Sequence, residues 1–109
     1  MRWSSPNFND RKAFPEMIIL HYTGMRSTRA ALERLCDKQA QVSAHYLVDE
    51  KGKVYALVPE GKRAWHAGVA LWNGKSDINS RSIGIEISNA GHEFGYKPFP
   101  VEQIDSCLL

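Results

Sequence analysis

The sequence predicts an α/β protein with a mixed central β-sheet flanked by helices, and three observations indicate this fold class. An apolar run ends at a histidine within Met17–Gly24. A segment with helical spacing and then a segment of alternating polarity follow it, and a second alternating segment spans Arg81–Asn89. Strands interleaved with helices are typical of a sheet covered by helices. No repeat or linker interrupts residues 1–109, so we expect a single domain.

The N-terminal half is expected to hold an arm, a strand and a helix. Residues 1–16 contain Pro6 and Pro15 and read as an extended surface arm, held down by the aromatic residues Trp3, Phe8 and Phe14. Residues 18–20 form a buried strand that ends at His21. Ser27 is a suitable N-cap for a helix whose apolar residues recur at helical spacing; these are Ala31, Leu32, Leu35 and Cys36.

His21 is the first candidate for chemistry. A histidine at the carboxyl end of a buried strand lies where α/β sheets open into a crevice. Such a residue is either a hydrogen-bonded core histidine or a metal ligand. The pattern alone leaves both roles open.

A β-hairpin is predicted for the middle of the chain. Val42–Asp49 alternates, with Val42, Ala44, Tyr46 and Val48 on one face. Glu50–Gly52 supplies a turn into a second strand over Lys53–Val58. From Glu60 to Arg81 we expect a long irregular loop, in which Trp65 and Trp72 either pack the loop against the body or line a ligand site.

Glu86 is the second candidate. Residues 81–89 form a strand with Ile83, Ile85 and Ile87 on one face. Glu86 projects from the opposite face, whose other residues are small, which favours an open cleft where burial and a nearby cation tune its pKa. The alternative is a solvated glutamate on an edge strand.

Composition excludes several classes of protein. The chain is 43% hydrophobic and 24% charged, with a formal net charge of +2 and a pI near 8.6, and it has no basic run for a nucleic-acid backbone. Cys36 and Cys107 are far apart and in no metal-ligand spacing. No stretch reaches the ~18 apolar residues of a membrane span, and no apolar leader precedes the first strand. We therefore expect a cytoplasmic protein.

Four blocks of sequence resemble the zinc-dependent N-acetylmuramoyl-L-alanine amidases of the amidase-2 type, which are related to peptidoglycan recognition proteins. The blocks are MIILHYTG, VSAHYLVDEKG, VPEGKRAWHAG and NSRSIGIEISN, in the family's order across residues 17–89. The resemblance implies hydrolysis of the amide between N-acetylmuramic acid and L-alanine, with peptidoglycan fragments or muropeptides as partners. It also implies Zn²⁺ as the cofactor.

The resemblance also assigns roles to individual residues. It makes His21 a zinc ligand and Glu86 the general acid/base. The substrate-binding residues that it implies are Trp65, His66, Ala67 and Asn79. In the family, the remaining zinc ligands lie in a block beyond the helix that we predict from Pro100, whose apolar side holds Ile104, Cys107 and Leu108. The sequence ends before that block, so we expect that it lacks a C-terminal portion of the domain. The alternative function is therefore a non-catalytic module that binds muropeptides.

Overall fold

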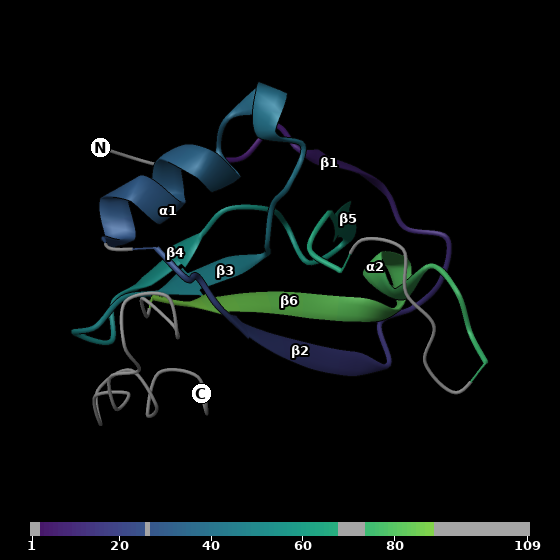
Figure 1. The fold of residues 1–109 in the computed structure, drawn as a ribbon. Coiled ribbons are helices and arrows are strands. Elements are labelled where there is room, and N and C mark those ends of the chain that lie inside the picture. Colours follow the sequence, from purple (N-terminus) through teal and green to yellow (C-terminus); the bar gives the residue numbers. More distant parts are fainter. Residues whose placement is uncertain (1–2, 26, 68–73, 89–109) are drawn as a thin grey trace.

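The computed structural model describes residues 3–25, 27–67 and 74–88 and shows a mixed sheet covered by a helix (Figure 1). The elements in chain order are β1 (Phe8–Asp10), β2 (Met17–Tyr22), α1 (Thr28–Leu35), the 3-10 helix η1 (Lys38–Ala40), β3 (Tyr46–Val48), β4 (Val54–Ala56), β5 (Lys62–Ala64), α2 (Ile78–Arg81) and β6 (Ser82–Ile87). This arrangement confirms the predicted α/β class.

The main sheet has four strands in the order β2-β6-β3-β4. Strand β6 is parallel to both β2 and β3, and β3 is antiparallel to β4. Because β6 has a partner on each side, the alternative of Glu86 on an edge strand is wrong. Strand β6 therefore carries Glu86 into the centre of the sheet.

Helix α1 covers one face of this sheet, above β3 and β4 (Figure 1). The predicted N-cap is confirmed, since the Ser27 hydroxyl accepts a hydrogen bond of 3.0 Å from the Ala30 N–H. Such a cap contributes about 1 kcal/mol. The apolar side of the helix meets the sheet in a core of buried residues: Ala31, Leu32, Leu35, Leu47 and Leu57.

The N-terminal arm differs from the expectation. Residues 8–10 form strand β1, which pairs with β5 in a separate antiparallel sheet. Phe14 is 94% exposed and Phe8 is 38% exposed, so these two rings do not hold the arm. Trp3 packs against the core, as predicted. Buried polar groups also hold the arm: Ser5 Oγ donates to the Leu35 carbonyl, and Asn7 Nδ2 donates to the carbonyls of Asp37 and Val42.

The predicted hairpin is present but shorter. Gly52 takes a φ of 85° in its turn, where a glycine avoids Cβ strain. The strand predicted over 42–49 forms only at 46–48, because Ser43 N donates to the Trp65 carbonyl and not to a neighbouring strand. Residues 42–45 therefore brace the Trp65 segment.

The predicted irregular loop over 60–81 contains two ordered elements, β5 and α2. Both escaped prediction because β5 has only three residues and α2 has only four, too few to show a period. Trp72 and the helix predicted from Pro100 lie outside the described residues.

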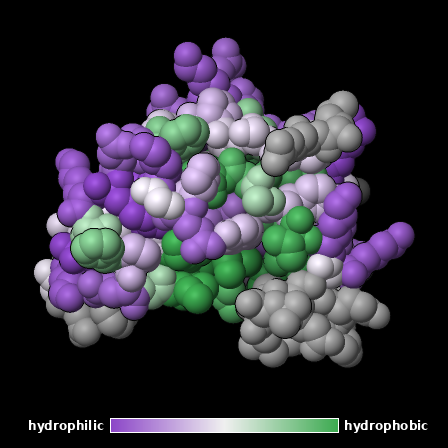
Figure 2. Space-filling model, turned by 180° about the vertical axis from the view of Figure 1, so that it is seen from behind, coloured by the Kyte–Doolittle hydropathy of each residue, from purple (hydrophilic) through white to green (hydrophobic). Residues whose placement is uncertain are grey.

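The second face of strand β2 is apolar and exposed. The predicted strand is present, but the prediction that residues 18–20 are buried is wrong. Ile18, Leu20 and Tyr22 are 66%, 55% and 44% exposed, while His21 lies on the opposite side of the strand. Figure 2 shows that hydrophobic residues also gather in the lower half of the rear face of the molecule. No described helix has the length and apolar character needed to cross a membrane.

Candidate active site

His21 and Glu86 are cross-strand neighbours in the parallel pair β2 and β6. The alternation of each strand places both residues on the side opposite the exposed face of β2. The register pairs them directly. Two chemically distinct groups, an imidazole and a carboxyl, thus meet at one level of the sheet.

Glu86 is partly buried, and one oxygen of its carboxyl group is buried and unsatisfied. Its Oε2 has no hydrogen-bond partner among the described residues. Burial raises the pKa of Glu86 to about 7, because the low-dielectric surroundings disfavour the carboxylate. The nearby cation that the sequence reasoning invoked makes no contribution to this pKa. A carboxyl group with such a pKa can both accept and release a proton near neutral pH.

The imidazole of His66 lies against His21. His21 Nε2 and His66 Nδ1 are 3.1 Å apart, and the two rings form a T-shaped pair. The pKa of His66 is lowered to about 3. Burial is the largest cause, and the neighbouring His21 and His45 add to it. Burial also lowers the pKa of His21. Both rings are therefore neutral at pH 7 and have a nitrogen lone pair available.

Hydrogen bonds fix the tautomer of His66. Ser82 Oγ donates to the Ile78 carbonyl at 2.7 Å, so its oxygen accepts from His66 Nε2–H at 3.0 Å. His66 Nδ1 is then unprotonated and faces His21. The hydroxyl of Ser82 was not identified from the sequence, because its role depends on strand β6 meeting the Trp65–Ala67 segment.

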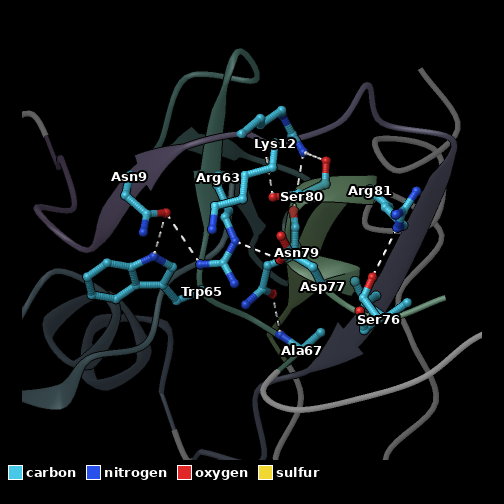
Figure 3. A network of polar contacts seen from close by, with 12 residues as sticks. Asn9, Lys12, Arg63, Trp65, Ala67, Ser76, Asp77, Asn79, Ser80 and Arg81 are labelled. Carbon is cyan, nitrogen blue, oxygen red and sulfur yellow. Dashed lines mark hydrogen bonds and ion pairs between the residues drawn. The ribbon is translucent and has the colours of Figure 1, made fainter.

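Asn79 positions the segment that carries His66. Its Oδ1 accepts hydrogen bonds from the backbone N–H groups of His66 and Ala67, at 3.0 and 2.8 Å. The side chain is buried, with 6% exposure. Figure 3 shows the surrounding network, in which Trp65 Nε1 and Arg63 donate to Asn9 and Arg63 also pairs with Asp77. These hydrogen bonds and the ion pair thus hold the Trp65–Ala67 segment in place.

His45 forms a second fixed histidine beneath the site. It is fully buried, its Nδ1 accepts from the Gly84 N–H at 3.0 Å, and its Nε2 donates to the Lys62 carbonyl at 2.8 Å. These two hydrogen bonds connect β6 to β5 through the His45 ring. The ring contacts β6 at Gly84, two residues before Glu86.

A cavity of about 130 Å³ adjoins these groups. Its lining includes Glu86, His66 and Trp65, together with three polar residues that the sequence did not single out: Thr23, Arg34 and Ser43. Arg34 comes from α1. Neither Ala67 nor Asn79 lines it, and their predicted contact with substrate stays a prediction.

The imidazole of His21 and the carboxyl group of Glu86 are the kinds of group that bind a divalent cation, but they do not make a complete site. A neutral imidazole beside a buried carboxyl atom without a partner is the chemistry of a metal site. A catalytic zinc takes three protein ligands. Within residues 3–25, 27–67 and 74–88, no group of three or more histidine, cysteine or acidic residues could hold a metal ion. The described residues therefore contain at most part of such a site.

Comparisons with known proteins identify related sequences. The family described as N-acetylmuramoyl-L-alanine amidase, Amidase_2, matches residues 10–108. N-acetylmuramoyl-L-alanine amidase AmiD of Escherichia coli (strain K12) is 36% identical over 110 residues, which cover 88% of this chain and 39% of AmiD. The 1,6-anhydro-N-acetylmuramyl-L-alanine amidase AmpD of the same organism is 49% identical over 47 residues, 43% of this chain and 26% of AmpD.

Solved structures show the same fold. A crystal structure of an AmpD derivative has a TM-score of 0.82 at 26% identity, and the match covers 97% of this chain and 68% of that one. E. coli AmiD, in complex with anhydro-N-acetylmuramic acid-L-Ala-D-γ-Glu-L-Lys, has a TM-score of 0.72 at 37% identity, covering 92% and 43%. The chain thus spans about two fifths of the length of AmiD.

Proposed function

Because the chain belongs to the N-acetylmuramoyl-L-alanine amidase family, we propose that the protein hydrolyses the amide bond between N-acetylmuramic acid and L-alanine in muropeptides. The observation that carries this proposal is the direct pairing of His21 with Glu86, beside a cavity that Glu86 lines. Amide hydrolysis needs an activated water and a group that moves protons, and these two side chains suit those tasks.

Zinc is the cofactor in this proposal, since amidases of this family are generally zinc-dependent. His21 would contribute one ligand through its ring nitrogen, which is neutral and half-buried. When bound, zinc supplies Lewis-acid chemistry that activates water and polarises the amide carbonyl.

Glu86 acts in this proposal as the general acid/base. Its carboxylate accepts a proton from the attacking water, and the resulting carboxylic acid donates that proton to the departing amine of L-alanine. The pKa of about 7 suits both steps, because proton transfer is most effective when the pKa lies near the working pH.

The proposed substrate carries the anhydro form of muramic acid. Support comes from AmiD and from AMPDH3 of Pseudomonas aeruginosa, whose solved complexes contain anhydromuropeptides. The proposed substrate-binding residues remain Trp65, His66, Ala67 and Asn79. The first two line the cavity, and the last two are joined by the hydrogen bond from the Ala67 N–H to Asn79 Oδ1.

We propose that the protein acts in the cytoplasm, which cell fractionation tests.

Zinc-loaded protein incubated with an anhydromuropeptide should release free peptide, measured by chromatography and mass spectrometry. Glu86→Gln should lower kcat by about 10²- to 10⁴-fold while zinc content stays the same. Glu50→Gln, in the exposed turn of the hairpin, is the matched control and should retain full turnover. Release no faster than in buffer, or full turnover by Glu86→Gln, would contradict the proposal.

A muropeptide-binding module is the second candidate function. The described residues favour it in one respect, because they contain no three-ligand metal cluster. Calorimetry with anhydromuropeptide, combined with metal analysis, separates the two candidates. Micromolar binding without zinc and without peptide release supports the module, whereas about one zinc per chain with turnover supports the amidase.

A further inference from the structure

We propose that Ser82 and His66 are positioning residues that fix the tautomer of His21, so that its Nε2 carries the proton and its Nδ1 keeps the lone pair for a ligand. The relay of hydrogen bonds begins at the Ile78 carbonyl and ends at His21. The assignment of the tautomer rests on these hydrogen bonds, whereas the use of Nδ1 by a metal ion rests on the proposed function.

Ser82 sets the direction of the relay. The Ile78 carbonyl can only accept, so Ser82 Oγ donates its single hydrogen there, at 2.7 Å. Ser82 Oγ therefore accepts from His66 Nε2–H, at 3.0 Å. Ser82 is fully buried, so bulk water does not compete for either bond. The proton of His66 is thus held on Nε2.

The next bond of the relay assigns the tautomer of His21. His21 Nε2 and His66 Nδ1 are 3.1 Å apart, and a hydrogen bond between two nitrogens needs one proton. A second proton on His66 would make that ring a cation, which its burial and the positive charges of Arg11 and Arg63 disfavour. The shared proton therefore belongs to His21 Nε2. A neutral imidazole has only one N–H, so Nδ1 of His21 keeps the lone pair.

This arrangement is the one that a metal-binding histidine uses. Such a histidine donates its second ring N–H to a fixed acceptor, which sets the tautomer and the orientation of the ring. Within the described part of the chain, the ring of His21 makes its hydrogen bond through Nε2, to His66. His66 thus acts through His21 and is not itself a ligand of the cation.

The acceptor is itself held in place. Asn79 Oδ1 accepts from the His66 N–H at 3.0 Å, and Trp65 N donates to Ser43 Oγ at 2.8 Å. The rings of His21 and His66 meet at 70° and do not stack. Because the backbone is fixed on both sides of the His66 ring, Nδ1 is directed at His21 before any ligand arrives.

NMR of the metal-free wild-type protein, with ¹⁵N-labelled histidine at pH 7, tests the assignment. We expect a one-bond ¹H–¹⁵N coupling at His21 Nε2 and a ¹⁵N–¹⁵N coupling across the hydrogen bond to His66 Nδ1. A proton on His66 Nδ1 or on His21 Nδ1 overturns the inference. The measurement uses no metal and no substrate, so the peptide-release assay still decides the proposed function separately.

A variant at Ser82 tests whether the relay acts over its full length, since Ser82 Oγ bonds to His66 and not to His21. Ser82→Ala removes the acceptor of His66 Nε2–H, so His66 can carry its proton on Nδ1 and donate to His21. We expect a second set of signals in which His21 is protonated on Nδ1. Ser76→Ala, at an exposed serine, is the matched control and should leave the signals unchanged.

Unchanged His21 signals in Ser82→Ala, or the same change in Ser76→Ala, would overturn the inference. The wild-type couplings need no substitution, so they decide the question even if Ser82→Ala fails to fold.

Discussion

Gly84 lies directly beneath the imidazole of His66. A Cβ atom at position 84 would lie 2.5 Å from ring atoms Cγ and Cδ2 and 2.8 Å from Nδ1 of His66. Cβ atoms essentially never make non-bonded contacts this short, and the hydrogen bonds from Asn79 to the His66 and Ala67 backbone limit how far the ring can move. The absence of a side chain in the centre of β6 is therefore a condition for the contact between His66 and His21.

Gly84→Ala should displace the His66 ring and lower the stability of the protein. Overpacking of this kind costs about 1–3 kcal/mol. Gly61→Ala is the control, since a Cβ at that position meets nothing within 4 Å and its φ is not positive. Urea unfolding of both variants measures the effect, and equal stabilities would contradict the role of Gly84.

Burial of Glu86 predicts a pH dependence of stability in the metal-free protein. The folded state raises the pKa from 4.5 to about 7, so it favours the neutral acid. Stability from this group is therefore full below pH 4.5 and is lost as the pH rises through 7. At about 1.4 kcal/mol for each pH unit, the loss amounts to about 3 kcal/mol.

Glu86→Gln removes this dependence, because glutamine does not titrate. We expect the variant to be more stable than the wild type at pH 8 and to match it at pH 4, as measured by urea unfolding with chelator present. A stability difference between the two proteins that stays constant from pH 4 to pH 8 would contradict the burial of the carboxyl group.

His45 holds β6 through the Gly84 N–H. His45→Leu leaves that buried N–H and the Lys62 carbonyl without their partner, which should cost about 1–3 kcal/mol. His45→Asn is the matched variant, because its Oδ1 occupies the place of Nδ1 and can still accept from Gly84. Chemical denaturation should show that the wild type is more stable than His45→Asn and that His45→Asn is more stable than His45→Leu. Equal stability of the two variants would show that the Gly84 N–H needs no acceptor.

Asn79 should act on the site through the segment that carries His66. Asn79→Ala removes the acceptor of two backbone N–H groups, so we expect a loss of about 1–3 kcal/mol in stability. Asn79→Asp keeps an oxygen in the same place and should retain most of that stability. Hydrogen exchange of the His66 and Ala67 amides tests the mechanism directly, since only the alanine variant should lose their protection.

The local elements were determined by the sequence. The apolar run before His21 predicted β2, Ser27 and the apolar spacing predicted α1, and the alternation around Glu86 predicted β6. Each of these signals depends on neighbours within a few residues, where hydrophobic period and capping act. The family blocks added the expected roles of His21 and Glu86, because the order of short motifs is also contained in the chain.

The relations between distant segments were decided only by the tertiary structure. Pairing of β6 with β2 placed Glu86 beside His21, and the same sheet brought Ser82 and Gly84 against a histidine from another segment. No period in the sequence encodes a contact between a hydroxyl and a ring nitrogen 16 residues apart. Burial likewise emerges only when the layers pack, and it is burial that raises the pKa of Glu86 and keeps the imidazoles of His21 and His66 neutral.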